Sequence, residues 1–255
     1  MLRFFITLSY DGAAYHGWQI QPDAPSVEET VECALSTLLR QNIDIVGAGR
    51  TDAGVNAGMM VAHFDFDPPD DSPEWCRQLA YKLNKMLPRD IAVRRIEQVS
   101  SEMHARFSAK FRTYRYFVHV QKEPCMRHYS WQIPYPGLDF GLMNEAAKVI
   151  MEYTDFTSFS KTNTDVKTND CHITRAEWRP CTASVPSGET GQWVFEITAN
   201  RFLRNMVRAI VGTLVEVGRG RLSVDDVRNI IEARNRCRAG ESVPGNALFL
   251  VDIEY

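Results

Sequence analysis

The sequence contains no uninterrupted apolar run of about 18 residues, so we expect no membrane-spanning helix. Its start has a short apolar stretch without a signal-peptide cleavage site, and it alternates like a strand, so we interpret it as part of the fold. The six cysteines are scattered and form no CxxC pair. This usage indicates reduced thiols in the cytoplasm rather than a disulfide framework or a zinc site.

Motifs for metals, nucleotides and hydrolytic serines are also missing. The histidines show no ligand spacing, and no HExxH occurs. No G-x-x-x-x-G-K-[ST] loop is present, and no serine lies in a nucleophile elbow. We therefore expect a protein that works with no metal and no cofactor.

The formal net charge of -3 argues only weakly against a polyanionic partner, because the charges are segregated. Residues 65–74 carry five acidic groups and no basic one. Residues 94–127 carry eight basic and three acidic groups, and residues 201–238 carry nine arginines and four acidic groups. Since local patches determine affinity for a polyanion, the two basic segments favour nucleic acid, although solvated surface arginines are the simpler alternative.

Hydrophobic periodicity and turn residues predict an α+β fold of two similar β-α-β-type halves, 1–106 and 107–255, whose sheets meet. Neither half shows the regular alternation of a parallel barrel. We expect helices at 25–41 and 223–236, with Ser26 and Ser223 as caps, and at 74–87, 137–151 and 200–218. Strands are expected at 2–10, 43–46, 59–66, 91–100, 111–120, 175–183, 191–199 and 246–255.

The stretch GAGRTDAGV, residues 47–55, places Asp52 in a loop of otherwise small residues between two expected strands. Glycine lets a backbone approach a ligand closely, and an ionised aspartate can act as a nucleophile. On an extended backbone, Arg50 would face the other side from Asp52. Turn chemistry is the alternative role for an aspartate in such a loop.

Arginines and tyrosines supply two further signals. Arg201, Arg204 and Arg208 fall at i, i+3 and i+7 on the expected helix 200–218, with no acidic residue among them. Such a stripe binds phosphate or a buried carboxylate, unless it is simply solvated.

In the expected strand 111–120, Tyr114 and Tyr116 share one face with Arg112, while Arg115 points to the other. Rings that stack on bases beside guanidinium groups suit RNA, and tyrosines packed in a core are the alternative.

Six stretches along the chain form a recognisable set: YDGAAYHGWQIQPDAPSVEETVECAL, GAGRTDAGVNA, KFRTYRYFV, DFTSF, NRFLRNMVRAIVGTLVEVG and VPGNALFLVDIEY. This set resembles the tRNA pseudouridine synthase A family. The resemblance implies an RRM-like pseudouridine synthase fold, with mainly antiparallel sheets that meet around a central cleft. It also implies isomerisation of uridine to pseudouridine in the anticodon stem-loop of tRNA, at tRNA positions 38, 39 and 40, by a homodimer.

The resemblance assigns a role to each candidate residue. Asp52 is the nucleophile, Arg50 holds the flipped base out, and Tyr114 stacks on the base and later helps to remove a proton. Arg208 pairs with the aspartate, and Leu248 lines the uracil pocket. The small loop residues leave room for the flipped nucleotide. The arginine-rich segments, with Arg201 and Arg204, would line a groove for the stem.

Two positions depart from the family pattern. Asn56 stands where the family has its usual histidine, and Asn246-Ala247 replaces the usual His-Gly. We expect these changes to affect loop packing or substrate preference.

Two other functions stay open: a non-catalytic RNA-binding protein on the same scaffold, and a phosphate-handling hydrolase that uses Asp52 and a metal. The sequence also leaves open whether Asp52 attacks C1′, attacks C6, or acts as a base toward a glycal.

Overall fold

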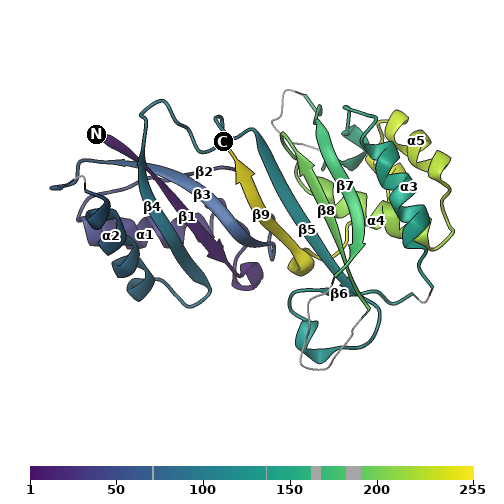
Figure 1. Ribbon diagram of the computed structural model, residues 1–255, viewed down its shortest axis with the longest axis horizontal. Helices are drawn as coiled ribbons and strands as arrows, with labels where there is room; N and C mark the ends of the chain where they lie inside the picture. Colours follow the sequence, from purple (N-terminus) through teal and green to yellow (C-terminus); the bar gives the residue numbers. More distant parts are fainter. Residues whose placement is uncertain (71, 136, 162–167, 182–190) are drawn as a thin grey trace. The chain divides into compact units, whose positions relative to one another are not determined.

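A computed structural model describes residues 1–70, 72–135, 137–161, 168–181 and 191–255 (Figure 1). The chain forms two compact units. Unit 1 consists of Met1–Lys110 together with Phe249–Tyr255, and unit 2 consists of Phe111–Leu248. Each unit has its own strands and helices, so the two are described separately.

Unit 1 is built on a mainly antiparallel sheet in the order β4-β1-β3-β9. Ile6 at its centre lies opposite Ala62 on one neighbouring strand and Ile96 on the other. The last strand runs parallel to β3, where Asn56 lies opposite Phe249. The strands are β1 (Leu2–Tyr10), β2 (Val46–Gly47), β3 (Asn56–Phe66), β4 (Ile91–Val99) and β9 (Leu248–Glu254).

The short strand β2 is a correction to the expected strand 43–46, because only Val46 of that stretch is in it. Two side chains of the preceding helix explain the difference. The backbone N–H of Ile43 donates to Ser36 Oγ over 2.9 Å, and that of Ile45 donates to Glu32 Oε1 over 2.8 Å. These amides therefore bond to the helix instead of to a neighbouring strand.

The helices of unit 1, α1 (Val27–Leu39) and α2 (Pro73–Met86), pack on each other, and α2 also packs on β4. Both begin at a serine cap: Ser26 accepts a hydrogen bond from the N–H of Glu29, and Ser72 accepts one from that of Trp75. Leu87 is extended and ends α2 before a proline. The cap at Ser26 and the end of α2 agree with the sequence pattern, which did not indicate the cap at Ser72.

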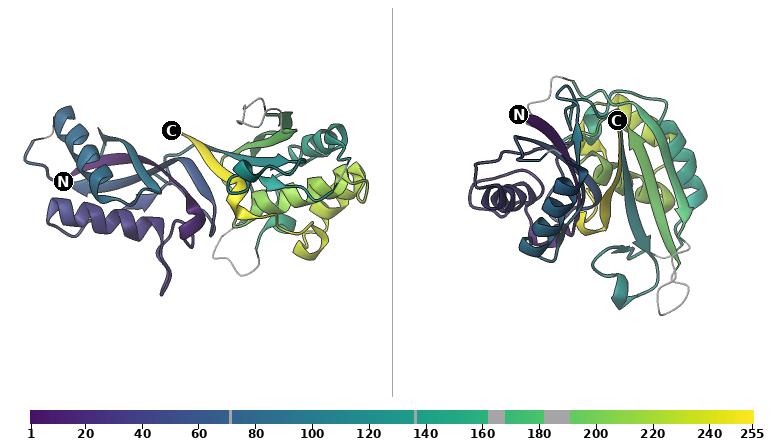
Figure 2. Two further views of the ribbon diagram at one scale, coloured as in Figure 1. Left: turned by 90° about the horizontal axis from the view of Figure 1, so that it is seen from below. Right: turned by 60° about the vertical axis from the view of Figure 1, so that its left-hand side comes forward.

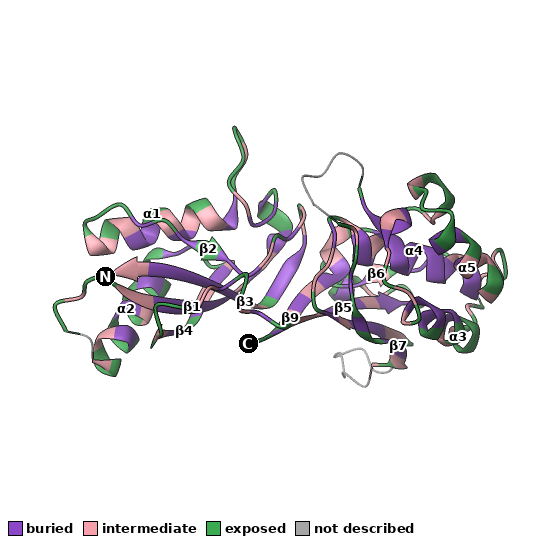
Figure 3. Ribbon diagram, turned by 90° about the horizontal axis from the view of Figure 1, so that it is seen from above, coloured by how far each residue is buried: buried purple, intermediate pink, exposed green. Residues whose placement is uncertain are grey.

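Unit 2 contains the antiparallel strands β5-β8-β7, with Tyr114 opposite Ile197, and the short β6 parallel to β5. Three helices lie together beside these strands (Figure 2). Helix α3 packs on both other helices, and α4 is buried on almost every side (Figure 3). The elements are β5 (Phe111–His119), β6 (Trp131–Gln132), β7 (Ile173–Pro180), β8 (Gln192–Ala199), α3 (Phe140–Ile150), α4 (Met206–Gly218) and α5 (Val224–Glu232). The end of the strand expected at 175–183 lies outside the described residues.

Helix α4 begins at Met206, six residues later than the expected helix 200–218. Asn205 has φ +67°, in the left-handed region that a continuous helix cannot contain. The preceding residues are held in a turn, in which the N–H of Met206 donates to the carbonyl of Leu203 over 3.1 Å. The carbonyl of Arg204 accepts from Lys161 over 3.2 Å. The expected helix is therefore wrong over its first residues.

The mixed α+β class with mainly antiparallel strands is confirmed. Within the described ranges, no helix has the length and apolar character needed to cross a bilayer.

Candidate active site

Asp52 lies in the loop that joins β2 to β3, as the sequence predicts. Its carbonyl accepts a hydrogen bond from the N–H of Val55 over 3.1 Å, which closes a tight turn. Gly54 inside that turn has φ +73°, a conformation that glycine adopts without strain. The Asp52 side chain is half-buried and that of Arg50 is exposed. The turn thus presents a carboxylate at the surface of a rigid loop.

The segment that follows β1 holds this loop on both sides of Asp52. The N–H of Trp18 donates to the carbonyl of Thr51 over 3.2 Å, and the N–H of Gly54 donates to the carbonyl of Tyr15, also over 3.2 Å. The hydroxyls of Tyr10 and Thr51 lie 2.9 Å apart in a buried hydrogen bond. Because its neighbours are fixed, the Asp52 backbone has little freedom to move.

Two glycines make this close approach possible. A Cβ on Gly17, where φ is +99°, would lie 2.3 Å from the carbonyl oxygen of Thr51. A Cβ on Gly12 would lie 2.2 Å from that of Val55. By contrast, a Cβ on Gly49 or Gly54 would meet no atom within 4 Å. The glycines before the loop therefore bring two backbones together, and those inside it leave open space.

Asn56, one of the two departures from the family pattern, is part of the same scaffold. It is buried, and its Oδ1 accepts a hydrogen bond from the N–H of Gly12 over 2.8 Å. Trp18 is also buried, and its Nε1 donates to Glu28 Oε1 over 3.0 Å, which ties the segment to α1. The sequence motifs contain Tyr10, Gly17 and Trp18, but they did not indicate that these residues position the Asp52 loop.

Tyr114 lies on β5 of unit 2 and is buried to 8% exposure. Its ring meets that of Phe202 edge to face, with centroids 5.1 Å apart. The next tyrosine, Tyr116, is fully buried, and its hydroxyl donates to the carbonyl of Pro244 over 2.9 Å. Tyrosines 114 and 116 thus share the inward face of the strand, as predicted.

Arg115 points to the opposite face, also as predicted, and there it serves the fold. Its Nε donates to Glu196 Oε2 over 2.5 Å, and Arg175 and Arg179 contact the same carboxylate. Burial works to raise the pKa of Glu196, but the hydrogen bond and charge of Arg115 and the other two guanidinium groups hold that pKa below its usual value. Glu196 is therefore an anion paired within the sheet.

Arg208 lies in the first turn of α4, and its Nε donates to the carbonyl of Val243 over 2.6 Å. The N–H of Val243 donates back to the carbonyl of Arg208 over 3.3 Å. The helix can approach this segment because a Cβ on Gly212 would lie 1.9 Å from the carbonyl oxygen of Glu241. Tyr116 on β5 donates to the carbonyl of Pro244, the residue after Val243. The segment that contains Val243 and Pro244 therefore connects α4 with β5.

Leu248 follows this segment and is buried to 5% exposure. Asn246 shortly before it donates from Nδ2 to the carbonyls of Arg127 and His128, each over 3.3 Å. The second departure from the family pattern thus contacts the loop that follows β5. Unit 2 connects Tyr114, Arg208 and Leu248 through β5, α4 and residues 243–248.

Arg201 and Arg204 precede α4 and so do not share a helix face with Arg208, which corrects the predicted stripe. Arg204 is exposed and Arg201 is half-buried. They flank Phe202, the residue that packs on Tyr114. Because of the turn at Asn205, these two arginines belong to the segment that contacts Tyr114 through Phe202, and not to the helix.

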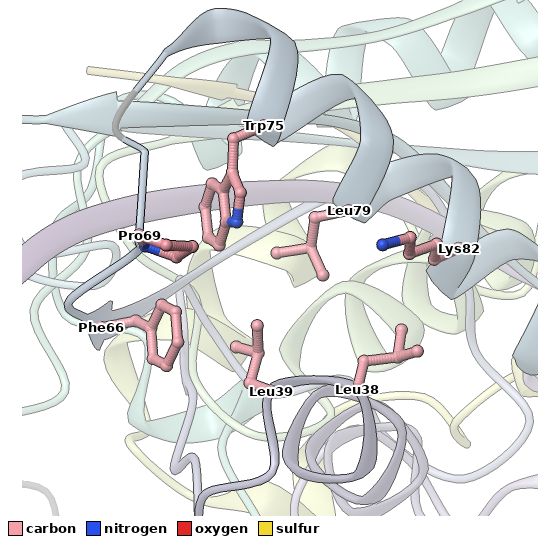
Figure 4. A pocket seen from close by; sticks show the side chains of 7 residues that line it. All are labelled: Leu38, Leu39, Phe66, Pro69, Trp75, Leu79 and Lys82. Atoms are coloured by element: carbon pink, nitrogen blue, oxygen red, sulfur yellow. The ribbon is translucent and has the colours of Figure 1, made fainter.

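The described residues contain no group of three His, Cys, Asp or Glu side chains that could hold a metal ion. A hollow of about 210 Å³ in unit 1 lies between α1, α2 and the end of β3 (Figure 4). It is lined by Leu38, Leu39, Phe66, Pro69, Trp75, Leu79 and Lys82. None of the candidate residues lines this apolar hollow, and it has no acid–base pair for chemistry.

Comparison with known protein families identifies a match. The model of a family described as "tRNA pseudouridine synthase" matches residues 6–108 and 153–255, one stretch in each half of the chain. Asp52, Arg208 and Leu248 lie in the matched stretches, and Tyr114 lies between them.

Curated relatives align along the whole chain. Proteins named "tRNA pseudouridine synthase A" from Bacteroides thetaiotaomicron and Porphyromonas gingivalis are 56% and 55% identical over 255 residues, covering 100% of this chain and 91% and 98% of theirs. A protein of the same name from Streptococcus thermophilus is 42% identical over 262 residues, covering 100% of both chains.

Proposed function

Because the chain belongs to the tRNA pseudouridine synthase family, we propose that it isomerises uridine to pseudouridine in the anticodon stem-loop of tRNA. The reaction breaks the N1–C1′ bond, turns the base and rejoins it through C5, so no atom is lost and no electron is transferred. The observation that carries the proposal is the Asp52 turn: a carboxylate on a backbone fixed by Trp18 and Tyr15, beside glycines with open space.

The residue roles follow the family pattern. Asp52 is the catalytic carboxylate, and Arg50, the exposed neighbour, holds the flipped base out of the stem. Tyr114 stacks on the uracil and takes part in proton removal, Arg208 compensates the Asp52 charge, and Leu248 lines the uracil pocket. The contacts that hold the Asp52 loop, Tyr114 and Arg208 favour this proposal, because a catalytic group must be held in place before the substrate arrives.

The substrate-binding surface includes the two basic segments, with Arg201 and Arg204 as phosphate contacts. We propose further that the working form is a cytoplasmic homodimer that needs neither metal nor cofactor. The half 1–106 supplies the aspartate loop, and the half 107–255 supplies the tyrosine strand and the arginines.

The decisive variant is Asp52→Asn, which keeps the shape of the side chain and removes its charge. Every mechanism considered for this reaction needs the anion, so pseudouridine formation is expected to fall to background. Binding of tRNA is expected to persist, since affinity comes mainly from phosphates and stacking. Asp44→Asn, at an exposed aspartate before the same loop, is the matched control and is expected to keep full turnover.

The measurement combines tRNA binding by filter retention with single-turnover tritium release from C5-labelled uridine, and a nucleotide-resolution map locates the product. Release by Asp52→Asn within about tenfold of wild type contradicts the assignment of Asp52. A wild-type protein that binds tRNA without forming pseudouridine is a non-catalytic RNA-binding protein. Turnover that stops in excess EDTA contradicts the metal-free mechanism.

A further inference from the structure

Unit 1 presents an aromatic ring that the proposed reaction does not use. Phe107 is 78% exposed, in a turn that follows β4. The turn is closed by two 2.9 Å hydrogen bonds between His104 and Ser108, one in each direction. His104 Nδ1 also accepts from the N–H groups of Arg106 and Phe107, over 3.1 and 3.3 Å. The exposed ring therefore stands on a fixed backbone.

This turn is anchored to the sheet of unit 1. The rings of His104 and His63 lie 4.5 Å apart, and His63 Nδ1 accepts from the N–H of Ala105 over 3.2 Å. Arg3 on β1 donates from Nη1 to the carbonyl of Met103 over 3.1 Å. Single exposed apolar side chains are common on protein surfaces, and this one differs in that its backbone is held in place by several hydrogen bonds.

The surroundings of the ring suit a nucleic acid base. The His104 ring lies against Phe107 with centroids 4.4 Å apart, and the Arg106 guanidinium is 5.9 Å from the Phe107 centroid. The part of the basic segment that belongs to unit 1, residues 94–110, carries four basic and two acidic groups. Aromatic rings beside guanidinium groups in a basic surface bind single-stranded nucleic acid, because the base stacks and the cation takes the phosphate.

We propose that Phe107, with His104 and Arg106, forms a stacking site for an unpaired base of the RNA substrate, other than the base that reacts. This inference rests on the proposed function for the identity of the RNA. Strand β3 begins just after the Asp52 turn and reaches His63 seven residues later, a span of about 23 Å. Bases within a stem are already paired and stacked, so the occupant is an unpaired nucleotide.

The chain provides a matched control in the same unit. Tyr81 on α2 is 65% exposed, and the Lys85 ammonium lies 5.4 Å from its ring centroid. It lies in the middle of its helix, Pro73–Met86, and Arg77 and Lys82 are also close to it in the sequence. Tyr81 therefore shares the exposure and the nearby cations, but no ring among the described residues contacts it as His104 contacts Phe107.

The first experiment measures affinity for uridine-containing tRNA. Phe107→Ala is expected to weaken binding about 5- to 100-fold and to raise KM, while kcat stays within about twofold. Phe107→Tyr keeps a ring and is expected to bind like wild type, as is Tyr81→Ala. Thermal unfolding of all variants shows whether Phe107→Ala still folds. If it does not fold, the fluorescence measurement described next tests the proposal.

The second experiment detects stacking itself. In Phe107→Trp the added indole emission is expected to be quenched when tRNA binds, whereas in Tyr81→Trp it is expected to stay unchanged. Wild-type affinity in a folded Phe107→Ala, or an unquenched Phe107→Trp, overturns the stacking site. A changed oligomeric state in Phe107→Ala with unchanged RNA affinity assigns the ring to a contact between copies and also overturns it. Failure of the wild-type protein to form pseudouridine contradicts the proposed function and not the stacking site, because the binding measurements do not depend on turnover.

Discussion

The side-chain oxygen of Asn56 accepts a 2.8 Å hydrogen bond from the backbone N–H of Gly12. Both residues are buried, and Asn56 is the first residue of β3 after the Asp52 turn. The residue that departs from the family pattern therefore joins the end of the aspartate loop to the segment after β1. An amide can do this because its carbonyl accepts without carrying a charge.

Asn56→Ala is expected to destabilise the protein by about 1–3 kcal/mol, since it leaves the buried N–H of Gly12 without this acceptor. Turnover is expected to fall with it, because the support of the Asp52 turn is loosened. Denaturant unfolding gives the free energy. Asn42→Ala, which loses only an exposed contact with Asp44, is the control and is expected to change stability by less than about 0.5 kcal/mol. Equal stability of the two variants contradicts a bracing role for Asn56.

Much of the fold could be predicted from the sequence because local signals and packing agree. Ser26 and Ser223 cap the helices that they were predicted to cap. The start of α4 could not be predicted, since apolar spacing from residue 200 continues unbroken into the helix. The backbone at Asn205 turns left-handed where its side chain bonds to Ser242, a residue far away in sequence. Such long-range bonds leave no local pattern.

The candidate residues could be predicted from motifs, but their supports could not. Asp52 stands in a specific motif, whereas the role of Gly17 depends on the approach of Thr51, 34 positions further along the chain. In the same way, Arg208 can be identified from its motif, in which an arginine occupies this position. Its partner Val243 comes from a loop that no periodicity connects with α4. Short motifs in the sequence identify the reactive side chains, whereas the placement of those side chains depends on tertiary contacts.

Because of His63, the free energy of unfolding is expected to decrease as the pH is lowered below about 6.5. Burial, and then the charge of Arg3, lowers the pKa of His63 to about 4 in the folded protein. Between these values the unfolded chain binds the proton and the folded protein does not, so unfolding is favoured as pH falls from about 6.5 to 4, by at most about 3 kcal/mol. Neighbouring His104, also with a lowered pKa, adds in the same direction. In His63→Asn the pH dependence of unfolding in this range is expected to flatten, and an unchanged slope contradicts the assignment.

Affinity for tRNA is expected to fall with salt, since each phosphate contact releases counterions and contributes a log–log slope of about -0.7 to -0.9. Arg201→Ala and Arg204→Ala are each expected to flatten the slope by less than about one unit. Arg77→Ala removes an exposed arginine that pairs with Glu74 on α2, and its slope is expected to match wild type. Filter binding over a salt series measures all three. Wild-type slopes for Arg201→Ala and Arg204→Ala would remove this segment from the RNA contacts.

Arg208→Met is expected to lose activity and stability together. If Arg208 compensates the Asp52 carboxylate, removing it leaves a shielded charge without its partner, at a cost of roughly 3–5 kcal/mol. The control Arg228→Met breaks a surface pair with Glu152 and is expected to lose about 1 kcal/mol or less. Adding Asp52→Ala to Arg208→Met should restore part of the stability in denaturant unfolding. A double variant no more stable than Arg208→Met shows that the two side chains are not partners.

Tyr114→Phe tests whether the hydroxyl of Tyr114 acts in proton transfer. The substitution keeps the ring and its edge-to-face contact with Phe202, so the strand and its stacking surface are expected to remain. Affinity for tRNA should therefore hold, while single-turnover tritium release falls by about 10²-fold or more. Tyr116→Phe is the matched control on the same face of β5. It removes a hydrogen bond to Pro244, which is expected to lower stability by about 1 kcal/mol and to leave tritium release within about tenfold of wild type. Wild-type release by Tyr114→Phe would exclude the hydroxyl from the proton-transfer step and leave Tyr114 only the stacking role, because the ring would then account for everything that the residue contributes.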